Sequence, residues 1–226
     1  MHRELGVHTI GAALRKIESD GDVDALRASG LRIANVIGVG HTGMEHALQV
    51  AAALDAPAIV FTTGPFGALD WEEAAYAFAA SMDAYPRSNV RLCLEHTNSL
   101  RTDVSFVHSL RDAIDLARRL DIHVCMEINA CWAERDLART IAEGIDRIGV
   151  VQVSDYAIGT LSTPNRLVPG DGDIPLVRII GQVLAAGYQG AFDIELVGPK
   201  IEQEGYRSAI GRSCTYVSDL LAALLP

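Results

Sequence analysis

Short apolar segments recur along this chain of 226 residues, and longer segments with a helical period separate them. Successive apolar segments begin about 25 to 40 residues apart, which is the spacing of βα units in a parallel sheet. They read as continuous apolar runs rather than alternating ones, as strands buried on both faces do. The predicted strands cover residues 31–37, 58–62, 90–94, 122–127, 149–153 and 191–196. This pattern predicts an α/β fold with parallel strands.

The segments between the predicted strands carry apolar residues three and four positions apart, as amphipathic helices do. Asp70 followed by Glu73 is a typical helix start. The predicted helices cover residues 43–54, 71–82, 107–120, 137–145 and 213–225. No linker rich in Pro, Gly or Ser divides the chain, so we expect one domain over residues 1–226.

Four of the predicted strands carry a potential metal ligand at or near their carboxyl end: Glu95, Glu127, Gln152 and Glu195. A carboxylate is seldom buried unless it is paired or binds a metal. Each residue alone has a structural explanation, such as an ion pair with Arg or a core hydrogen bond, but four such coincidences are rarer than one shared site. We therefore expect the four side chains to converge.

Two parallel architectures compete, an open doubly wound sheet and a closed (β/α)₈ barrel. Residues 38–43 match G-x-G-x-x-G, but no acidic residue ends the following strand, so the dinucleotide fingerprint is incomplete. Functional side chains at the carboxyl ends of successive strands are typical of a barrel, whose active site lies at that face. We expect a TIM barrel.

Oxygen ligands, three of them anionic, suit a hard divalent cation. Mg²⁺ or Mn²⁺ is expected first, and Co²⁺ or Zn²⁺ would also bind such a set. No pair of Cys or His has zinc-finger spacing, which argues against a structural zinc site.

Arg166 lies in a stretch, 149–174, that follows a predicted strand and contains the Gly-rich turn 169–173. Its guanidinium suits a carboxylate, a phosphate or paired hydroxyls of a substrate. The alternative is a structural arginine that pairs with Asp155 or Asp171.

The charge of the chain limits its partners. There are 29 acidic and 19 basic residues, a net charge of −10, which argues against nucleic acid and anionic membranes and favours a small-molecule substrate. The longest apolar stretches fall short of a membrane span, the first residues lack a signal peptide's apolar core, and the four Cys show no CxxC spacing. Cys93 and Cys125 are expected to be buried thiols, and the expected compartment is the cytoplasm.

Four motifs resemble the sugar phosphate isomerase/epimerase family, whose xylose isomerase-like barrels include endonuclease IV, hydroxypyruvate isomerase and ketose 3-epimerases. The motifs are VRLCLEH, VCMEINACW, VVQVSD followed by NRLVPGDGDIP, and GYQGAFDIELVG. The resemblance runs from about residue 5 to the C-terminus. It implies a divalent metal on Glu95, Glu127, Gln152 and Glu195, with Glu95 and Glu195 also moving the proton.

The chain departs from that family in several places. Glu127 stands where Asp is usual, Ala130 stands where a substrate-binding His is common, and Gln152 matches the hydroxypyruvate isomerase branch rather than the more frequent His. Residues 5–10 resemble the end of the second family strand, so the first βα unit is expected to be missing or modified. Unpaired sheet edges would result, from which we predict a homodimer, a higher homo-oligomer or a rearranged N-terminus.

The resemblance implies an isomerase or epimerase that acts on a keto sugar, polyol or hydroxy-keto acid through an enediolate. A metal-dependent dehydratase or lyase on a keto sugar or cyclitol is one alternative, and a degenerate barrel that serves as a partner subunit is another. The endonuclease branch fits poorly because the chain is acidic. The candidate substrate contacts are Arg166, His96, Asn129 and Trp132.

Overall fold

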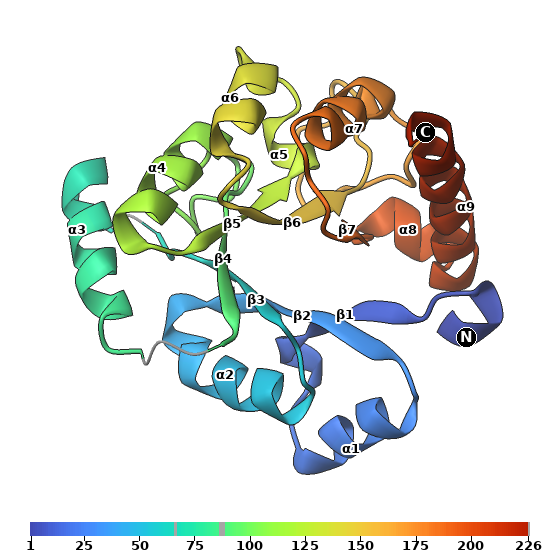
Figure 1. Cartoon of the computed structure of the whole chain (residues 1–226), viewed down its shortest axis with the longest axis horizontal. Helices are drawn as coiled ribbons and strands as arrows, with labels where there is room; N and C mark the ends of the chain where they lie inside the picture. The colour runs from blue at the N-terminus through green and yellow to red at the C-terminus, as the bar shows by residue number, and fades with distance from the viewer. Residues whose placement is uncertain (66, 86–88, 226) are drawn as a thin grey trace.

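Seven parallel strands form a nearly closed barrel in the computed structural model, which describes residues 1–65, 67–85 and 89–225 (Figure 1). Each strand pairs with the next in sequence, so the order in the sheet is the order in the chain. The strands are β1 (Thr9–Ala13), β2 (Arg32–Gly40), β3 (Ala58–Thr62), β4 (Arg91–Glu95), β5 (His123–Glu127), β6 (Ile148–Val153) and β7 (Phe192–Ile194). The predicted TIM-barrel architecture is confirmed.

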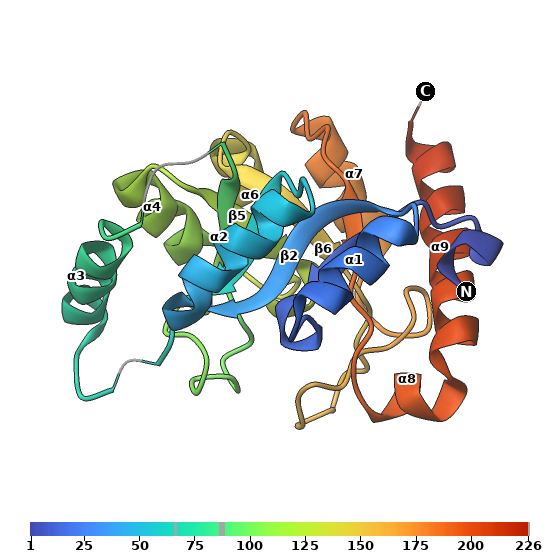
Figure 2. The same cartoon turned by 90° about the horizontal axis from the view of Figure 1, so that it is seen from below.

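Helices surround the strands on the outside of the barrel (Figures 1 and 2). None of the helices in the described ranges is both long and apolar enough to cross a membrane. The α-helices are α1 (Asp20–Ala28), α2 (Met44–Ala53), α3 (Trp71–Met82), α4 (Leu110–Leu120), α5 (Ile128–Cys131), α6 (Leu137–Gly144), α7 (Leu176–Ala185), α8 (Pro199–Glu204) and α9 (Tyr206–Leu224), and short 3₁₀ turns are η1 (His2–Leu5), η2 (Leu14–Lys16) and η3 (His41–Gly43).

The start of α3 was predicted correctly from its capping residues. Asp70 Oδ1 accepts the Glu73 amide at 2.9 Å, and Glu73 Oε2 accepts the Asp70 amide at 3.0 Å. Two other predicted starts were wrong. Helix α4 begins three residues later than the predicted 107, because Ser109 caps it by accepting the Asp112 amide. Helix α9 begins at Tyr206 instead of at residue 213, directly after Gly205.

The core has two layers that follow from the alternation of side chains along each strand. Large side chains between the strands and the helices form the main cluster, which contains Ile59 and Phe61. A separate cluster of Ala58, Val60, Cys93, Cys125 and Val150 is formed by residues of the strands β3 to β6. The two cysteines are buried free thiols, as predicted, and burial raises the pKa of Cys93 to about 12.

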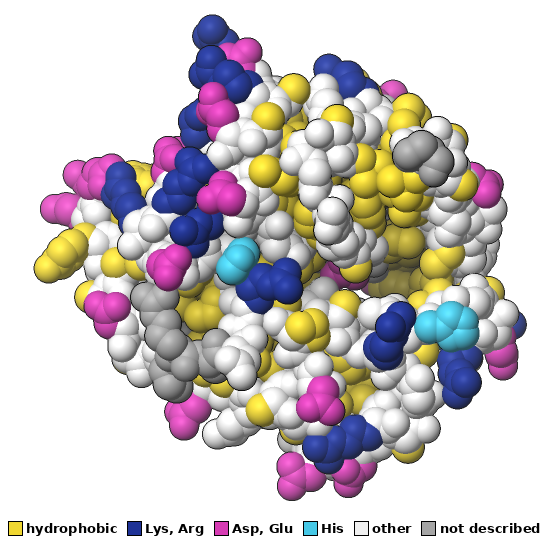
Figure 3. Space-filling model, viewed as in Figure 1, with side chains coloured by type: hydrophobic (Ala, Val, Ile, Leu, Met, Phe, Trp, Pro, Cys, Tyr) yellow, Lys and Arg dark blue, Asp and Glu magenta, His cyan; other side chains and the backbone are white. Residues whose placement is uncertain are grey.

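The barrel has a seam between β7 and β1, which are the two ends of the sheet and do not pair with each other in the described residues. A groove of about 920 Å³ lies there, lined by residues of β1, β7 and α9. Figure 3 shows a hollow on this face of the molecule, with hydrophobic side chains around it. The described residues thus form seven strands of a barrel that is not fully closed, and that it is the first βα unit which is missing or modified stays a prediction. The predicted first strand was misplaced, because residues 2–5 form η1 and the strand begins at Thr9.

Candidate functional site

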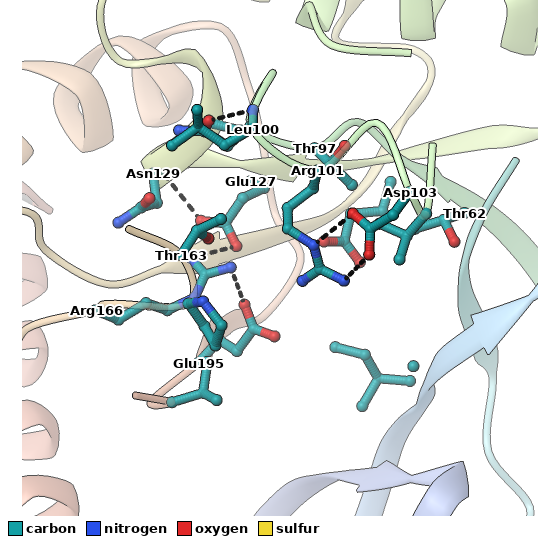
Figure 4. A pocket seen from close by; sticks show the side chains of 18 of the residues that line it. Thr62, Thr97, Leu100, Arg101, Asp103, Glu127, Asn129, Thr163, Arg166 and Glu195 are labelled. Carbon is teal, nitrogen blue, oxygen red and sulfur yellow. Dashed lines mark hydrogen bonds and ion pairs between the residues drawn. The ribbon is translucent and has the colours of Figure 1, made fainter. Parts of the chain in front are cut away.

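A cavity of about 680 Å³ opens at the carboxyl end of the barrel strands. Three carboxylates, Glu95, Glu127 and Glu195, line it together with Arg166 and Asn129 (Figure 4). This is the end of a parallel barrel at which active sites are built. Of the four predicted metal ligands, the structure therefore brings three to the wall of one cavity.

Strand register explains why these side chains meet. Glu95 is the last residue of β4, and Glu127 is the last residue of β5. Glu127 pairs in register with Gln152 of β6, so these two lie side by side. Glu195 follows β7 directly, and its amide donates to the Val153 carbonyl at 3.1 Å, which continues the ladder by one residue.

The guanidinium of Arg166 lies between two of the carboxylates. Its Nη1 is 2.8 Å from Glu127 Oε2, and its Nη2 is 2.5 Å from Glu195 Oε2. Nη1 also donates to the Ser154 hydroxyl at 2.9 Å. Figure 4 shows Arg166 reaching across the cavity to both acids. The Coulomb attraction within ion pairs shielded from water is stronger than in surface pairs, and the cost of removing the charges from water opposes it.

Asp155 fixes the loop that carries Arg166. One oxygen of its carboxylate accepts the Tyr156 and Ile174 amides at 2.9 and 3.0 Å, and the other accepts the Gly170 amide at 2.9 Å. Asp155 also forms an isolated antiparallel bridge with Leu167. The alternative that Arg166 pairs with Asp155 or Asp171 is wrong, because Asp155 binds backbone amides and Asp171 pairs with Arg212 at 2.5 Å.

The electrostatics of the site follow from packing several acids together. Burial raises the pKa of Glu95 well above its ordinary value, and the nearby Glu195 and Glu127 raise it further. Burial also raises the pKa of Glu127 to about 8, although Arg166 acts in the opposite direction. Burial disfavours the charged form of Arg166, but Glu127 and Glu195 outweigh it and raise the pKa of Arg166. The site accommodates protons and positive charge readily.

Gln152 is fully buried and does not line the cavity. Its Oε1 accepts the Cys125 thiol at 3.2 Å. Its register partner on β7 is Asp193, which accepts Asn35 Nδ2 at 3.0 Å. Burial raises the pKa of Asp193, while hydrogen bonds from Asn35 and Gln152 lower it. Gln152, Asp193 and Asn35 therefore form a polar group in the barrel interior next to Glu127.

The donor set fits a hard divalent cation in its chemistry, because three carboxylates and one amide oxygen are the ligands such ions prefer. The mutual repulsion that raises the pKa of Glu95 is what a bound cation relieves. Within the described ranges, no three Asp, Glu, His or Cys side chains are already arranged around a common ion position. Arg166 and the Asn129 amide, 2.8 Å from Glu127 Oε1, engage the oxygens of Glu127.

The other predicted contacts lie at different depths. Asn129 lines the cavity, and its Nδ2 donates to the Asp155 carbonyl at 3.1 Å. His96 is fully buried, and its Nε2 accepts the Glu127 amide at 3.3 Å. Trp132 packs behind Tyr156, with ring centroids 6.5 Å apart, and it is Tyr156 that reaches the cavity. Substrate contact by His96 or Trp132 stays a prediction and requires these side chains to move.

Sequence reasoning missed a second charged pair in the cavity wall. Arg101 and Asp103, in the loop between β4 and α4, form two hydrogen bonds of 2.9 and 3.1 Å (Figure 4). In the sequence an Arg two residues before an Asp looks like any exposed ion pair. Asn35 and Asp193 were missed as a pair because 158 positions separate them.

Comparison with known proteins places this geometry in a family. The family model described as xylose isomerase-like TIM barrel matches residues 39–215. A crystal structure of a protein from Sinorhizobium meliloti 1021 superposes with a TM-score of 0.84 at 22% identity, over 97% of this chain and 90% of that one.

Two further crystal structures have the same fold. IolI protein with a bound zinc atom gives a TM-score of 0.80 at 13% identity, over 99% of this chain and 91% of that chain. The 3-keto-D-glucoside 4-epimerase YcjR from E. coli gives 0.72 at 18% identity, over 94% and 91%. No curated protein matches the sequence. Because the family model covers most of the chain, the protein belongs to the family of xylose isomerase-like TIM barrels.

Proposed function

We propose that this protein is a divalent-metal-dependent isomerase or epimerase of a keto sugar, polyol or hydroxy-keto acid. The observation that carries the proposal is the placement of Glu95, Glu195 and Arg166 on the wall of one cavity. Proton transfer at a carbon next to a carbonyl needs two groups that exchange a proton with the substrate. The solved epimerase and the zinc-bound IolI protein of the same fold support this assignment.

The two acids suit complementary roles. The carboxylate of Glu195, paired with Arg166, accepts the proton from the substrate carbon, and an enediolate results. Glu95, in its protonated form, returns a proton to the opposite face or to the neighbouring carbon. Arg166 orients the substrate hydroxyls with the donors that face the cavity. Each turnover leaves Glu195 protonated and Glu95 ionised, and exchange with solvent resets them.

Glu95, Glu127, Gln152 and Glu195 are the proposed metal ligands. A divalent ion held there would stabilise the negative charge that develops on the substrate oxygens during enolisation. Mg²⁺ or Mn²⁺ suits the oxygen donors best, and Zn²⁺ or Co²⁺ is compatible with them.

The proposal is tested by solvent exchange. The protein is incubated with Mn²⁺ and a panel of ketoses and hydroxypyruvate in D₂O, and loss of the proton next to the carbonyl is followed by NMR. Exchange is expected for at least one substrate, and Glu195→Gln should slow it by roughly 10²-fold or more. Thermal unfolding of the variant, expected to match the parent, controls for misfolding.

The same samples distinguish the alternatives. Growth of an enone absorbance without an isomeric product would indicate the dehydratase or lyase. Exchange at the same rate in Glu195→Gln would remove this residue from the chemistry. Absence of exchange and of bound metal would favour a non-catalytic partner subunit.

A further inference from the structure

Arg166 supplies a positive charge at the place where the proposed metal ligands converge. Its two Nη atoms contact Glu127 and Glu195, and Glu95 interacts electrostatically with the same guanidinium. The side chain is only 15% exposed, and the Glu127 side chain is 2% exposed, so water screens these pairs weakly. In this arrangement Arg166 neutralises the carboxylates as a bound cation would.

The guanidinium is not fully satisfied in this position. Nε of Arg166 is buried and donates to no acceptor among the described residues. A buried donor without a hydrogen-bond partner costs free energy. When a ligand brings further acceptors into the cavity, the Arg166 side chain therefore gains by moving toward them. Its backbone, in contrast, is held in place, because the Arg166 amide donates a hydrogen bond to the Val197 carbonyl at 3.1 Å and Asp155 anchors the loop. The side chain can therefore move while the loop stays in place.

We propose that Arg166 is a built-in competitor for the metal, which sets the affinity of the site by occupying oxygens of Glu127 and Glu195. The inference rests on the metal site of the proposed function. An ion and a guanidinium that share these two carboxylates repel each other across a few ångströms of low dielectric. When an ion binds, Arg166 withdraws from at least one acid toward the cavity, where substrate oxygens satisfy its donors.

The test is Mn²⁺ binding, measured by isothermal titration calorimetry with manganese chloride as the only ligand, after chelator treatment of the purified chain. Arg166→Gln removes the competing charge but keeps a polar side chain, and it should tighten Mn²⁺ binding by about tenfold or more. Arg166→Lys keeps the charge but cannot bridge both acids, so a smaller tightening is expected.

Arg101→Gln is the matched control. Arg101 also lines the cavity, but it is already paired with Asp103, and its removal leaves Glu127 and Glu195 as they are. Its Mn²⁺ affinity should stay within about twofold of the parent, because Arg101 is partly exposed and pairs with Asp103 rather than with Glu127 or Glu195. An equal tightening in Arg101→Gln would mean that net charge alone, rather than occupancy by Arg166, sets the affinity, and would overturn the inference.

Unchanged or weaker binding in Arg166→Gln would also overturn it, since the arginine would then support the site. Circular dichroism verifies folding, and if Arg166→Gln does not fold, absence of any tightening in Arg166→Lys rejects the inference instead. Failure of the proposed function is separable. Solvent exchange by the parent with no effect of Arg166→Gln on Mn²⁺ binding rejects only the competitor, whereas no Mn²⁺ binding in any variant rejects both.

Discussion

Nη2 of Arg166 lies 2.5 Å from Oε2 of Glu195, although the first residue belongs to the loop between β6 and α7 and the second follows β7. The pair joins a loop to the end of a strand at the mouth of the barrel. It ties the charge of the site to the conformation of one loop, and that loop is held by Asp155.

Replacement of Asp155 by Asn should destabilise the protein by about 2–4 kcal/mol. The carboxylate accepts three backbone amides, and an amide side chain cannot accept on both of its ends. Denaturant unfolding measures the loss. Asp171→Asn is the control, because Asp171 makes an exposed ion pair with Arg212 and should change stability by less than about 1 kcal/mol. Equal losses in both variants would contradict the anchoring role.

Gly144 should not tolerate even alanine. A Cβ at this end of α6 would overlap the Ile114 side chain of α4, so Gly144→Ala should cost about 1–3 kcal/mol. Adding Ile114→Ala should recover part of that cost in a double-mutant cycle, which urea unfolding can measure.

Gly181→Ala is the matched control for that cycle. A Cβ at Gly181 would meet only Leu224 Cδ2, at 3.8 Å, and alanine is the better helix former. This variant should be neutral or more stable by up to about 1 kcal/mol. If Gly144→Ala behaved in the same way, the close packing of α6 on α4 would be refuted.

His96 should make the fold sensitive to acid. Burial, followed by the proximity of His108, lowers the pKa of His96 to about 3, below its ordinary 6.5. As the pH falls, His96 is therefore protonated in the unfolded chain at a higher pH than in the folded protein. The contribution of neutral His96 to the free energy of unfolding is complete above pH 6.5 and is lost between pH 6.5 and about 3.

The variant His96→Gln isolates this contribution, since Gln can still accept the Glu127 amide. The difference in unfolding free energy between parent and variant should shrink by about 1.4 kcal/mol per pH unit below pH 6. Denaturant unfolding from pH 7 to 4.5 gives that difference, and His46→Gln controls for loss of an exposed histidine. A difference independent of pH would show that the pKa of His96 is not lowered in the folded protein.

The seam between β7 and β1 leads us to expect self-association. Unpaired strand edges are normally covered, and a second copy of the chain that fills the groove is the cover we predict. Light scattering coupled to size exclusion should give a dimer or larger species at micromolar concentration. A monomer at all concentrations would show that the groove stays open or is covered from within.

Much of the barrel could be predicted from the sequence, because buried parallel strands are local apolar runs. The boundaries of β3 at Ala58–Thr62 and α3 at Trp71–Met82 were predicted without error. The first strand was misplaced by several residues, since Leu5 and Val7 are apolar but belong to η1 and the turn after it. Apolar character alone does not distinguish a strand from a 3₁₀ turn.

The candidate site was predictable to the extent that it depends on strand ends. Glu95, Glu127 and Glu195 reach one cavity because each stands at or just beyond the carboxyl end of its strand. The burial of Gln152 was not predictable, because its side chain is turned to the Cys125 thiol instead of lining the cavity. Nor could the sequence place Arg166 between two acids, since that depends on the path of the 22-residue loop 154–175.

The anions of this site come from the rigid scaffold, and the cation among them comes from a connecting loop. Exchange of that loop between related barrels would therefore change the net charge of the mouth without altering a single strand. A shape-preserving graft of residues 154–175 that lacks the arginine would leave three acids facing one another. Related barrels can therefore come to bind ligands of different charge when this one loop is replaced. The strands and helices of the fold stay the same.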